Sequence, residues 1–237
     1  VKRASLHNSD QIKKLSLRKG DIVFIEKGGE IIPKIVSVDN NQRGNENNEI
    51  KFISECPDCR TKLIRIEGEA QHYCPNQNYC EPQNISRIQH FASRKAMNID
   101  GLGNERIALF YRKSVISNIA DLYTISFESL QELEGMGDKS IKKVIDSIEL
   151  SKNRPFHKVL FGLGIRHVGE TVAIKLSNAF KSIDELINSD VESLLSVNEI
   201  GERIALSISN YFQDSANKNI LNRLKNAGLI FSIQEKN

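Results

Sequence analysis

A short turn sequence recurs four times in the second half of the chain at a nearly constant interval, and this repeat constrains the fold more than any other feature. The copies align on glycines separated by 34, 32 and 32 residues, namely Gly103, Gly137, Gly169 and Gly201. An apolar residue precedes each glycine, and another follows four positions later. A fixed period of this size indicates repeated supersecondary units, each of which buries its apolar face against its neighbours.

The physics of one copy predicts two helices joined by a tight turn. Glycine permits the left-handed or crowded backbone that such a turn requires. The second helix begins with backbone N–H groups that have no partner inside the helix and that lie at the positive end of its dipole. These groups can bind a phosphate and contact nucleic acid without reading its base sequence. The pattern resembles the helix-hairpin-helix motif of DNA repair and replication proteins, although glycines that end helices in an ordinary all-α bundle would explain a single copy.

The four copies differ in glycine content and in charge. The first two contain a Gly-apolar-Gly turn followed by a basic helix, whereas His167 and Glu199 replace the first glycine in the third and fourth copies. A carboxylate there would repel a phosphate, so we expect the fourth copy mainly to pack the bundle and the first three to contact DNA. Charge reversal at Lys139 should then weaken DNA binding more than charge reversal at Arg203. The residues of this half predicted to contact DNA are Gly101, Gly103, Arg106, Gly135, Gly137, Lys139, Arg166 and Gly169.

Apolar residues at helical spacing continue around these turns, and residues 85–237 are predicted to be helical throughout. Ser182 and Glu185 form a capping-box sequence ahead of one of the helices. The predicted fold class is therefore multidomain and mainly α. The expected helices span residues 85–97, 105–113, 126–133, 139–152, 155–161, 170–180, 183–189, 191–195, 202–212 and 216–227.

Residues 1–53 show a different pattern, in which short apolar runs alternate with turn sequences. Strands are predicted over residues 22–25, 31–38 and 50–53. Pro33 indicates that the second strand begins at an edge or a bulge, because proline cannot donate to a ladder. The pattern suits part of a small barrel such as the five-stranded oligonucleotide-binding (OB) fold, and an SH3-like barrel is nearly as compatible. Arg3 and Lys27 are predicted to face a phosphate backbone, with a solvated barrel surface as the alternative for each.

Residues 54–84 contain all the cysteines of the chain: Cys56, Cys59, Cys74 and Cys80. The first pair has the C-x2-C spacing that lets two thiolates converge on one ion, whereas five residues separate the members of the second pair. Four soft ligands favour a closed, tetrahedral zinc site of the structural type. Two disulfides are the alternative. The sequence shows no secretory signal, however, so we expect a cytosolic protein, in which thiols are kept reduced. His72 could also replace one cysteine as a ligand.

Charge and motif content narrow the possible activities. The net charge of +3 is compatible with nucleic-acid binding but too small to establish it. No apolar run approaches the length of a membrane span, so we expect a cytoplasmic protein without membrane contacts. The stretch from Asn98 to Gly101 resembles the K-x-D-G sequence of nucleotidyltransferases, but Asn98 lacks the amine that would be adenylated. No catalytic residues are therefore predicted in this chain.

Seven short segments carry the most specific sequence signal, namely residues 1–8, 17–21, 29–33, 90–97, 99–103, 120–123 and 163–169. The first three resemble the OB domain of bacterial NAD-dependent DNA ligases, and the last four resemble the helix-hairpin-helix domain of the same family. The cysteines are similar in number and spacing to its zinc finger. The resemblance is collinear along essentially the whole chain and implies three domains, a partial OB fold at 1–53, a four-cysteine zinc finger at 54–84 and four helix-hairpin-helix motifs at 85–237.

The resemblance implies the DNA-gripping portion of an enzyme. In the family, NAD and Mg²⁺ are bound and a lysine is adenylated in other domains, AMP passes to the 5′-phosphate of a nick, and the nick is sealed. Because Val1 begins inside the barrel, we expect a piece of a longer protein that is inactive alone, monomeric, and bound to nicked double-stranded DNA. Two alternatives remain, a non-enzymatic helix-hairpin-helix DNA-binding module and a zinc-stabilised protein-interaction scaffold that binds no nucleic acid.

Overall fold

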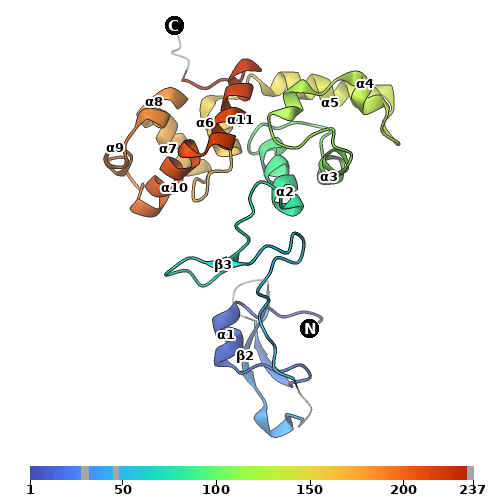
Figure 1. The fold of residues 1–237 in the computed structure, drawn as a ribbon, viewed down its shortest axis with the longest axis vertical. Coiled ribbons are helices and arrows are strands. Elements are labelled where there is room, and N and C mark those ends of the chain that lie inside the picture. The colour runs from blue at the N-terminus through green and yellow to red at the C-terminus, as the bar shows by residue number, and fades with distance from the viewer. Residues whose placement is uncertain (28–31, 45–47, 234–237) are drawn as a thin grey trace. The chain divides into compact units, whose positions relative to one another are not determined.

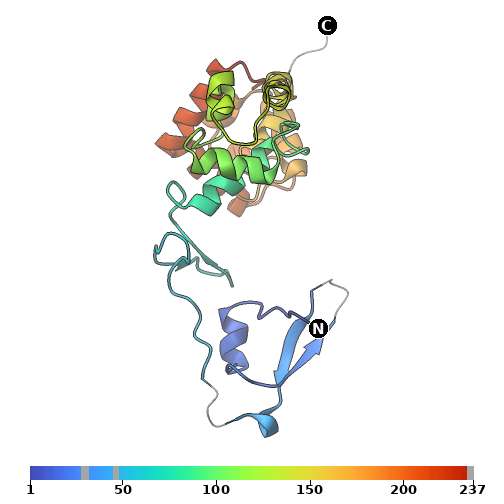
Figure 2. The same ribbon diagram turned by 90° about the vertical axis from the view of Figure 1, so that its right-hand side faces the viewer.

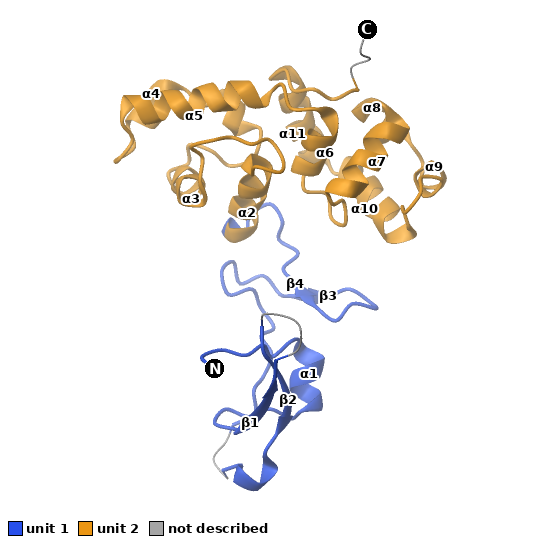
Figure 3. Cartoon of the chain, turned by 180° about the vertical axis from the view of Figure 1, so that it is seen from behind, with its two compact units in different colours: residues 1–81 blue, residues 82–237 orange. Residues whose placement is uncertain are grey.

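The structure, a computed structural model, describes residues 1–27, 32–44 and 48–233 of the chain. The chain divides into two compact units, Val1–Glu81 and Pro82–Asn237 (Figure 3). The named strands lie in the first unit, and the second unit is built from helices. The predicted multidomain, mainly α fold class is therefore confirmed.

The first unit begins with a short helix beside a two-stranded ribbon, seen from two sides in Figures 1 and 2. Helix α1 spans Ser9–Lys14. Strands β1 (Val23–Glu26) and β2 (Lys34–Val38) pair antiparallel, and their register shifts within β1. Strand β2 begins directly after Pro33, in agreement with the missing N–H of that residue. A short 3₁₀ turn, η1 (Asn40–Gln42), follows.

Two features of this unit differ from the sequence-based prediction. The strand predicted over residues 50–53 is wrong, because no strand among the described residues pairs with this segment, and only Glu49 just before it forms an isolated bridge, with Arg18. The sequence also does not predict α1. This helix buries one apolar residue, Ile12, which is too few for helical periodicity. Its start depends instead on Asn8, whose side chain accepts a hydrogen bond from the first turn at 2.9 Å.

The remainder of the first unit is a small ribbon between the two cysteine pairs. Strand β3 (Ile64–Arg65) pairs antiparallel with β4 (His72–Tyr73). The Arg65 guanidinium donates two hydrogen bonds to the Asp10 carboxylate, at 2.7 and 2.5 Å. This two-pronged ion pair joins the ribbon to α1 and lowers the pKa of Asp10.

The helices of the second unit occupy their predicted places (Figure 1). The first helix begins before residue 85 and ends before residue 97. Its end was predicted too late because the apolar pattern continues into a turn that buries Ala96 and Met97. A 3₁₀ turn, η2, spans Asp121–Thr124. The helices are α2 (Glu81–Ala92), α3 (Asn104–Arg112), α4 (Phe127–Gln131), α5 (Asp138–Ser151), α6 (Phe156–Gly162), α7 (Glu170–Phe180), α8 (Ile183–Asn188), α9 (Val191–Leu195), α10 (Glu202–Gln213) and α11 (Ser215–Asn226).

One apolar core holds these helices together. It contains residues from every helix between α2 and α11, and its largest fully buried side chains include Phe91, Phe110 and Leu160. Burying a side chain of this kind stabilises the fold by about 1.5–3 kcal/mol. The last helix is also tied to η2 by Arg223, which donates a hydrogen bond to Asp121 at 2.7 Å. None of the described helices is long and apolar enough to cross a membrane.

Candidate nucleic-acid interface and metal centre

The four repeated turns share one backbone geometry although their sequences differ. The residue two positions before each aligned glycine is left-handed, with φ of 80°, 80°, 66° and 67° at Gly101, Gly135, His167 and Glu199. The apolar residue between them is buried in every copy: Leu102, Met136, Val168 and Ile200. We infer that burial of this middle residue sets the turn. This burial would hold His167 and Glu199 in a left-handed conformation, which costs a residue other than glycine about 1–2 kcal/mol.

Each turn leads into a helix whose first N–H groups have no capping side chain. The N-cap residue of α3, α5, α7 and α10 is the aligned glycine, and a Cβ built on any of these glycines would meet nothing within 4 Å. Helices α4, α8, α9 and α11 differ, because a Ser or Asp side chain at the N-cap accepts a hydrogen bond from the first turn. The helices that follow the repeated turns therefore present an open approach and N–H donors to an external anion.

The basic residues predicted at these helix starts have different environments. Lys139 and Arg166 are exposed. Arg106 is half-buried, and its guanidinium donates hydrogen bonds to the Gly101 carbonyl at 2.8 Å and to the Ser140 hydroxyl at 2.9 Å. Arg106 therefore ties the first turn to helix α5 of the second hairpin as well as contributing charge.

The two basic residues predicted in the barrel, Arg3 and Lys27, are both exposed on the first unit. His90, which lies on α2, has a structural role. Its Nε2 lies 2.8 Å from the Phe161 carbonyl oxygen, and the two rings contact edge to face.

Carboxylates beside the turns are paired with lysines that sequence reasoning did not connect to them. The pairs are Lys143–Asp100 at 2.7 Å, Lys175–Glu199 at 2.6 Å, and Lys158–Glu170. No local pattern could reveal these contacts, because the partners are far apart in sequence and meet only after the helices pack. Lys175 therefore offsets the repulsion that Glu199 would exert on a phosphate.

Each lysine partly neutralises its carboxylate and so reduces the effect of that carboxylate on the local potential. A hydrogen bond from Lys143 holds the pKa of Asp100 below its usual value. Lys158 has the same effect on the pKa of Glu170, the first residue of α7, and the charge of Lys95 adds to it. The third helix start is therefore more basic than its own sequence indicates. Lys95 and Lys158 are candidate functional residues that the sequence analysis missed.

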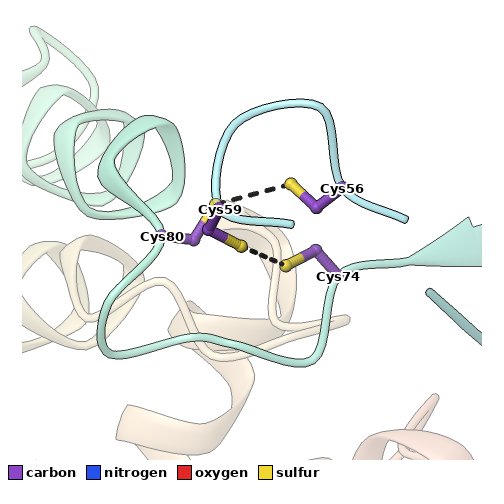
Figure 4. Close-up of side chains that lie close together, drawn as sticks. All are labelled: Cys56, Cys59, Cys74 and Cys80. Carbon is purple, nitrogen blue, oxygen red and sulfur yellow. Dashed lines mark hydrogen bonds between the residues drawn. The ribbon is translucent and has the colours of Figure 1, made fainter. Parts of the chain in front are cut away.

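The four cysteines converge from two segments of the first unit (Figure 4). Their Sγ atoms all lie within 4.8 Å of one another, with 3.4 Å between Cys59 and Cys74 and 3.9 Å between Cys56 and Cys80. A disulfide requires about 2.05 Å, so the two-disulfide alternative does not describe this structure. A tetrahedral ion with Zn–S bonds of about 2.3 Å would place the sulfurs about 3.8 Å apart. The donor set therefore fits zinc.

The environments of two of the thiols shift their pKa values in opposite directions. Hydrogen bonding to the side chain and backbone of Thr61 lowers the pKa of Cys59 to about 6, and Cys59 Sγ lies 3.3 Å from Thr61 Oγ1. Desolvation raises the pKa of Cys74 to about 12. A bound divalent cation would hold both as thiolates. His72 does not join the cluster and contacts Phe52, with ring centroids 4.6 Å apart and the ring planes tilted by 40°.

Four family models match the chain in order. The NAD-dependent DNA ligase OB-fold domain matches residues 1–48, and the NAD-dependent DNA ligase C4 zinc finger domain matches residues 55–81. A SAM-like helix-hairpin-helix tandem matches residues 93–149, and a helix-hairpin-helix motif matches residues 158–221. The first helix-hairpin-helix match contains the first two repeated turns, and the second contains the other two.

Curated relatives match the chain along nearly all of its length. A DNA ligase of Bacteroides fragilis is 55% identical over 229 residues, which are 97% of this chain and 34% of that protein. A DNA ligase of Flavobacterium psychrophilum is 52% identical over 237 residues, which are 100% of this chain and 36% of that protein. A DNA ligase of Porphyromonas gingivalis is 47% identical over 97% of this chain. The chain spans about a third of the length of these relatives.

Proposed function

We propose that this chain, which belongs to the NAD-dependent DNA ligase family through its OB-fold, C4 zinc finger and helix-hairpin-helix domains, is the part of such an enzyme that holds DNA around a nick. The observation that carries the proposal is the glycine N-cap of α3, α5 and α7, which leaves helix N–H groups without side-chain acceptors and open to approach. Hydrogen bonds from such groups to phosphate are charge-assisted. They are independent of base sequence, which suits an enzyme that must act at any break.

Within this proposal the domains divide the work as the sequence predicts. Residues 1–53 contact the duplex through Arg3 and Lys27, and residues 54–84 hold a structural zinc ion. Residues 85–237 grip the phosphate backbone through the first three hairpins, and the fourth hairpin mainly packs the bundle. The exposed position of Lys139 at the start of α5 supports a phosphate contact there.

The whole enzyme would use NAD and Mg²⁺ outside the residues of this chain. It would move AMP from NAD to a lysine and then to the 5′-phosphate of the nick, and the 3′-hydroxyl would displace AMP to close the strand. The contribution of this chain is to hold the two ends in place, because orienting two reactants lowers the barrier to their reaction. Alone, and as a monomer, the chain should bind nicked DNA without sealing it.

The test compares binding of the 237-residue chain to nicked and intact duplexes of the same sequence, with Lys139→Glu and Arg203→Glu as matched variants. Both residues are exposed and lie two positions after the aligned glycine of their hairpin. We expect tighter binding to the nicked duplex and an affinity that falls steeply with salt. Lys139→Glu should weaken binding about tenfold, because it replaces a favourable phosphate contact with a repulsion. Arg203→Glu should have little effect.

Each contrary outcome has its own meaning. Equal affinity for nicked and intact duplexes would favour a non-enzymatic DNA-binding module. Equal losses in the two variants would assign the fourth hairpin to the interface as well. No binding to either duplex would overturn the proposal and leave the protein-interaction scaffold.

A further inference from the structure

The lysines of two of the lysine–carboxylate pairs occupy equivalent positions in the repeat. Lys143 and Lys175 each lie six residues after the aligned glycine of their own hairpin, the second and the third. Each reaches out of its hairpin to the turn of a neighbour, Lys143 to Asp100 in the first turn and Lys175 to Glu199 in the fourth. The contacts group the hairpins as one with two and three with four. This is the same grouping as the two helix-hairpin-helix matches.

The contact between the first two hairpins includes more than one ion pair. The Asp100 N–H donates a hydrogen bond to the Ser147 hydroxyl on α5 at 2.6 Å. Arg106 reaches the same helix through the Ser140 hydroxyl. The Asp100 carboxylate also accepts the Gly101 N–H at 2.9 Å, so one side chain both shapes the first turn and binds Lys143. The first turn is therefore held against α5 from several sides.

We propose that Lys143 and Lys175 are positioning residues that latch the outer turns, the first and the fourth, to the helices of the inner hairpins. The first latch would fix the spacing between the uncapped helix starts of hairpins one and two, so that both can meet phosphates of one duplex. The second would hold the third hairpin in place against the fourth, which packs the bundle. The proposal rests on the DNA-binding function argued above. It differs from the sequence-based expectation, in which basic residues after the second turn act as phosphate ligands. Lys139 remains such a ligand, whereas the ammonium of Lys143 forms an ion pair with Asp100.

The two roles of Lys143 predict opposite effects for its partner. If Lys143 is a latch, Asp100→Asn removes the latch and weakens DNA binding. If Lys143 is a phosphate ligand, the same change removes a competing anion and strengthens binding. Asparagine is a suitable probe, because its carbonyl oxygen can still accept the Gly101 N–H and keep the turn.

The experiment measures DNA affinity against salt concentration for Lys143→Met, Asp100→Asn and the double variant, with Lys139→Met as the comparison on the same helix. A latch predicts that each single change weakens binding about two- to fivefold, as for exposed ion pairs, and that the double variant loses no more than either single variant. The slope of log affinity against log salt should stay unchanged. Lys139→Met should reduce that slope by about 0.9, because one fewer counterion is released.

Lys143→Arg, which keeps the ion pair, should retain normal affinity, and Lys175→Met with Glu199→Gln should repeat the pattern in hairpins three and four. The latch is overturned if Asp100→Asn tightens binding while Lys143→Met reduces the salt slope by about 0.9. It is also overturned if neither change alters affinity. If the unmodified chain does not bind DNA, the proposed function itself is overturned. Failure of the latch and failure of the proposed function are therefore distinguishable.

Discussion

Gly135 and Gly137 lie two residues apart in the second turn, yet a methyl group should cost different amounts at each. The φ angles are 80° at Gly135 and −86° at Gly137, and a Cβ at either position would meet nothing within 4 Å. Gly135→Ala should therefore lower the free energy of unfolding by about 1–2 kcal/mol through backbone strain alone, and Gly137→Ala should lower it by much less. Urea unfolding of both variants measures the difference. Equal losses would show that φ at Gly135 does not set the cost.

The same turns show what single residues reveal in sequence. Glycines and cysteines mark their positions directly, because few other residues supply a left-handed turn or four soft ligands. His167 and Glu199 give no such signal, although both are left-handed and each is followed by a buried apolar residue. The hydrogen bonds of Arg106 and the partner of Lys143 were equally hidden, since both depend on how separate helices pack.

At the scale of elements, helix α11 is attached to the bundle partly through Asp121. Burial would raise the pKa of Asp121, but hydrogen bonds from Ser117 and from Arg223 of α11 outweigh it and hold the pKa below its usual value. Asp121→Asn should lower the free energy of unfolding by about 1–3 kcal/mol at neutral pH. A matched control is Asp184→Asn, which removes an exposed partner of Lys225 on the same helix and should cost less.

The Asp121 contribution should depend on pH in one direction. A carboxyl group whose folded-state pKa is depressed stabilises the fold above its unfolded-state pKa of about 3.9, and the stabilisation is lost as pH falls through the folded-state value. The difference in unfolding free energy between the original chain and Asp121→Asn should therefore shrink as pH falls below about 4. Urea unfolding of both proteins at a series of pH values measures this difference. A difference that does not change with pH would show that packing, and not the charge of Asp121, causes the effect.

Elements were predictable where apolar spacing is sustained and hidden where it is not. Helices α5 and α10 repeat buried residues every three or four positions, and the sequence predicts both nearly to their ends. The first unit gives weaker signals, because three of the four residues of β1 are exposed and α1 buries one apolar side chain. Short elements of this kind have too little periodicity for a sequence pattern to define them.

At the scale of the whole molecule, the two units should respond differently to loss of metal. Among the described residues, the apolar core of the second unit contains none from the cysteine segment. That segment is short, and the two strands of its ribbon have only two residues each, so metal binding should supply most of its folding energy. A strong chelator should therefore release one zinc ion per chain and unfold this segment while the helical circular dichroism persists. Cys80→Ser should give the same result without chelator, and collapse of the helical signal would contradict the independence of the units.

The two units are continuous in the chain, meeting between Glu81 and Pro82. If each unit binds DNA weakly, the covalent link becomes important. Once one unit is bound, the other unit is held near the same DNA, so its binding is intramolecular and its local concentration is high. Affinity for a duplex that reaches both units could then exceed that of either unit by about 10²- to 10⁴-fold without any additional contact. A unit that lets go would stay tethered and rebind before the protein diffused away. Such a molecule would stay bound to a duplex for a long time, and it would move along the duplex by releasing and rebinding one unit at a time.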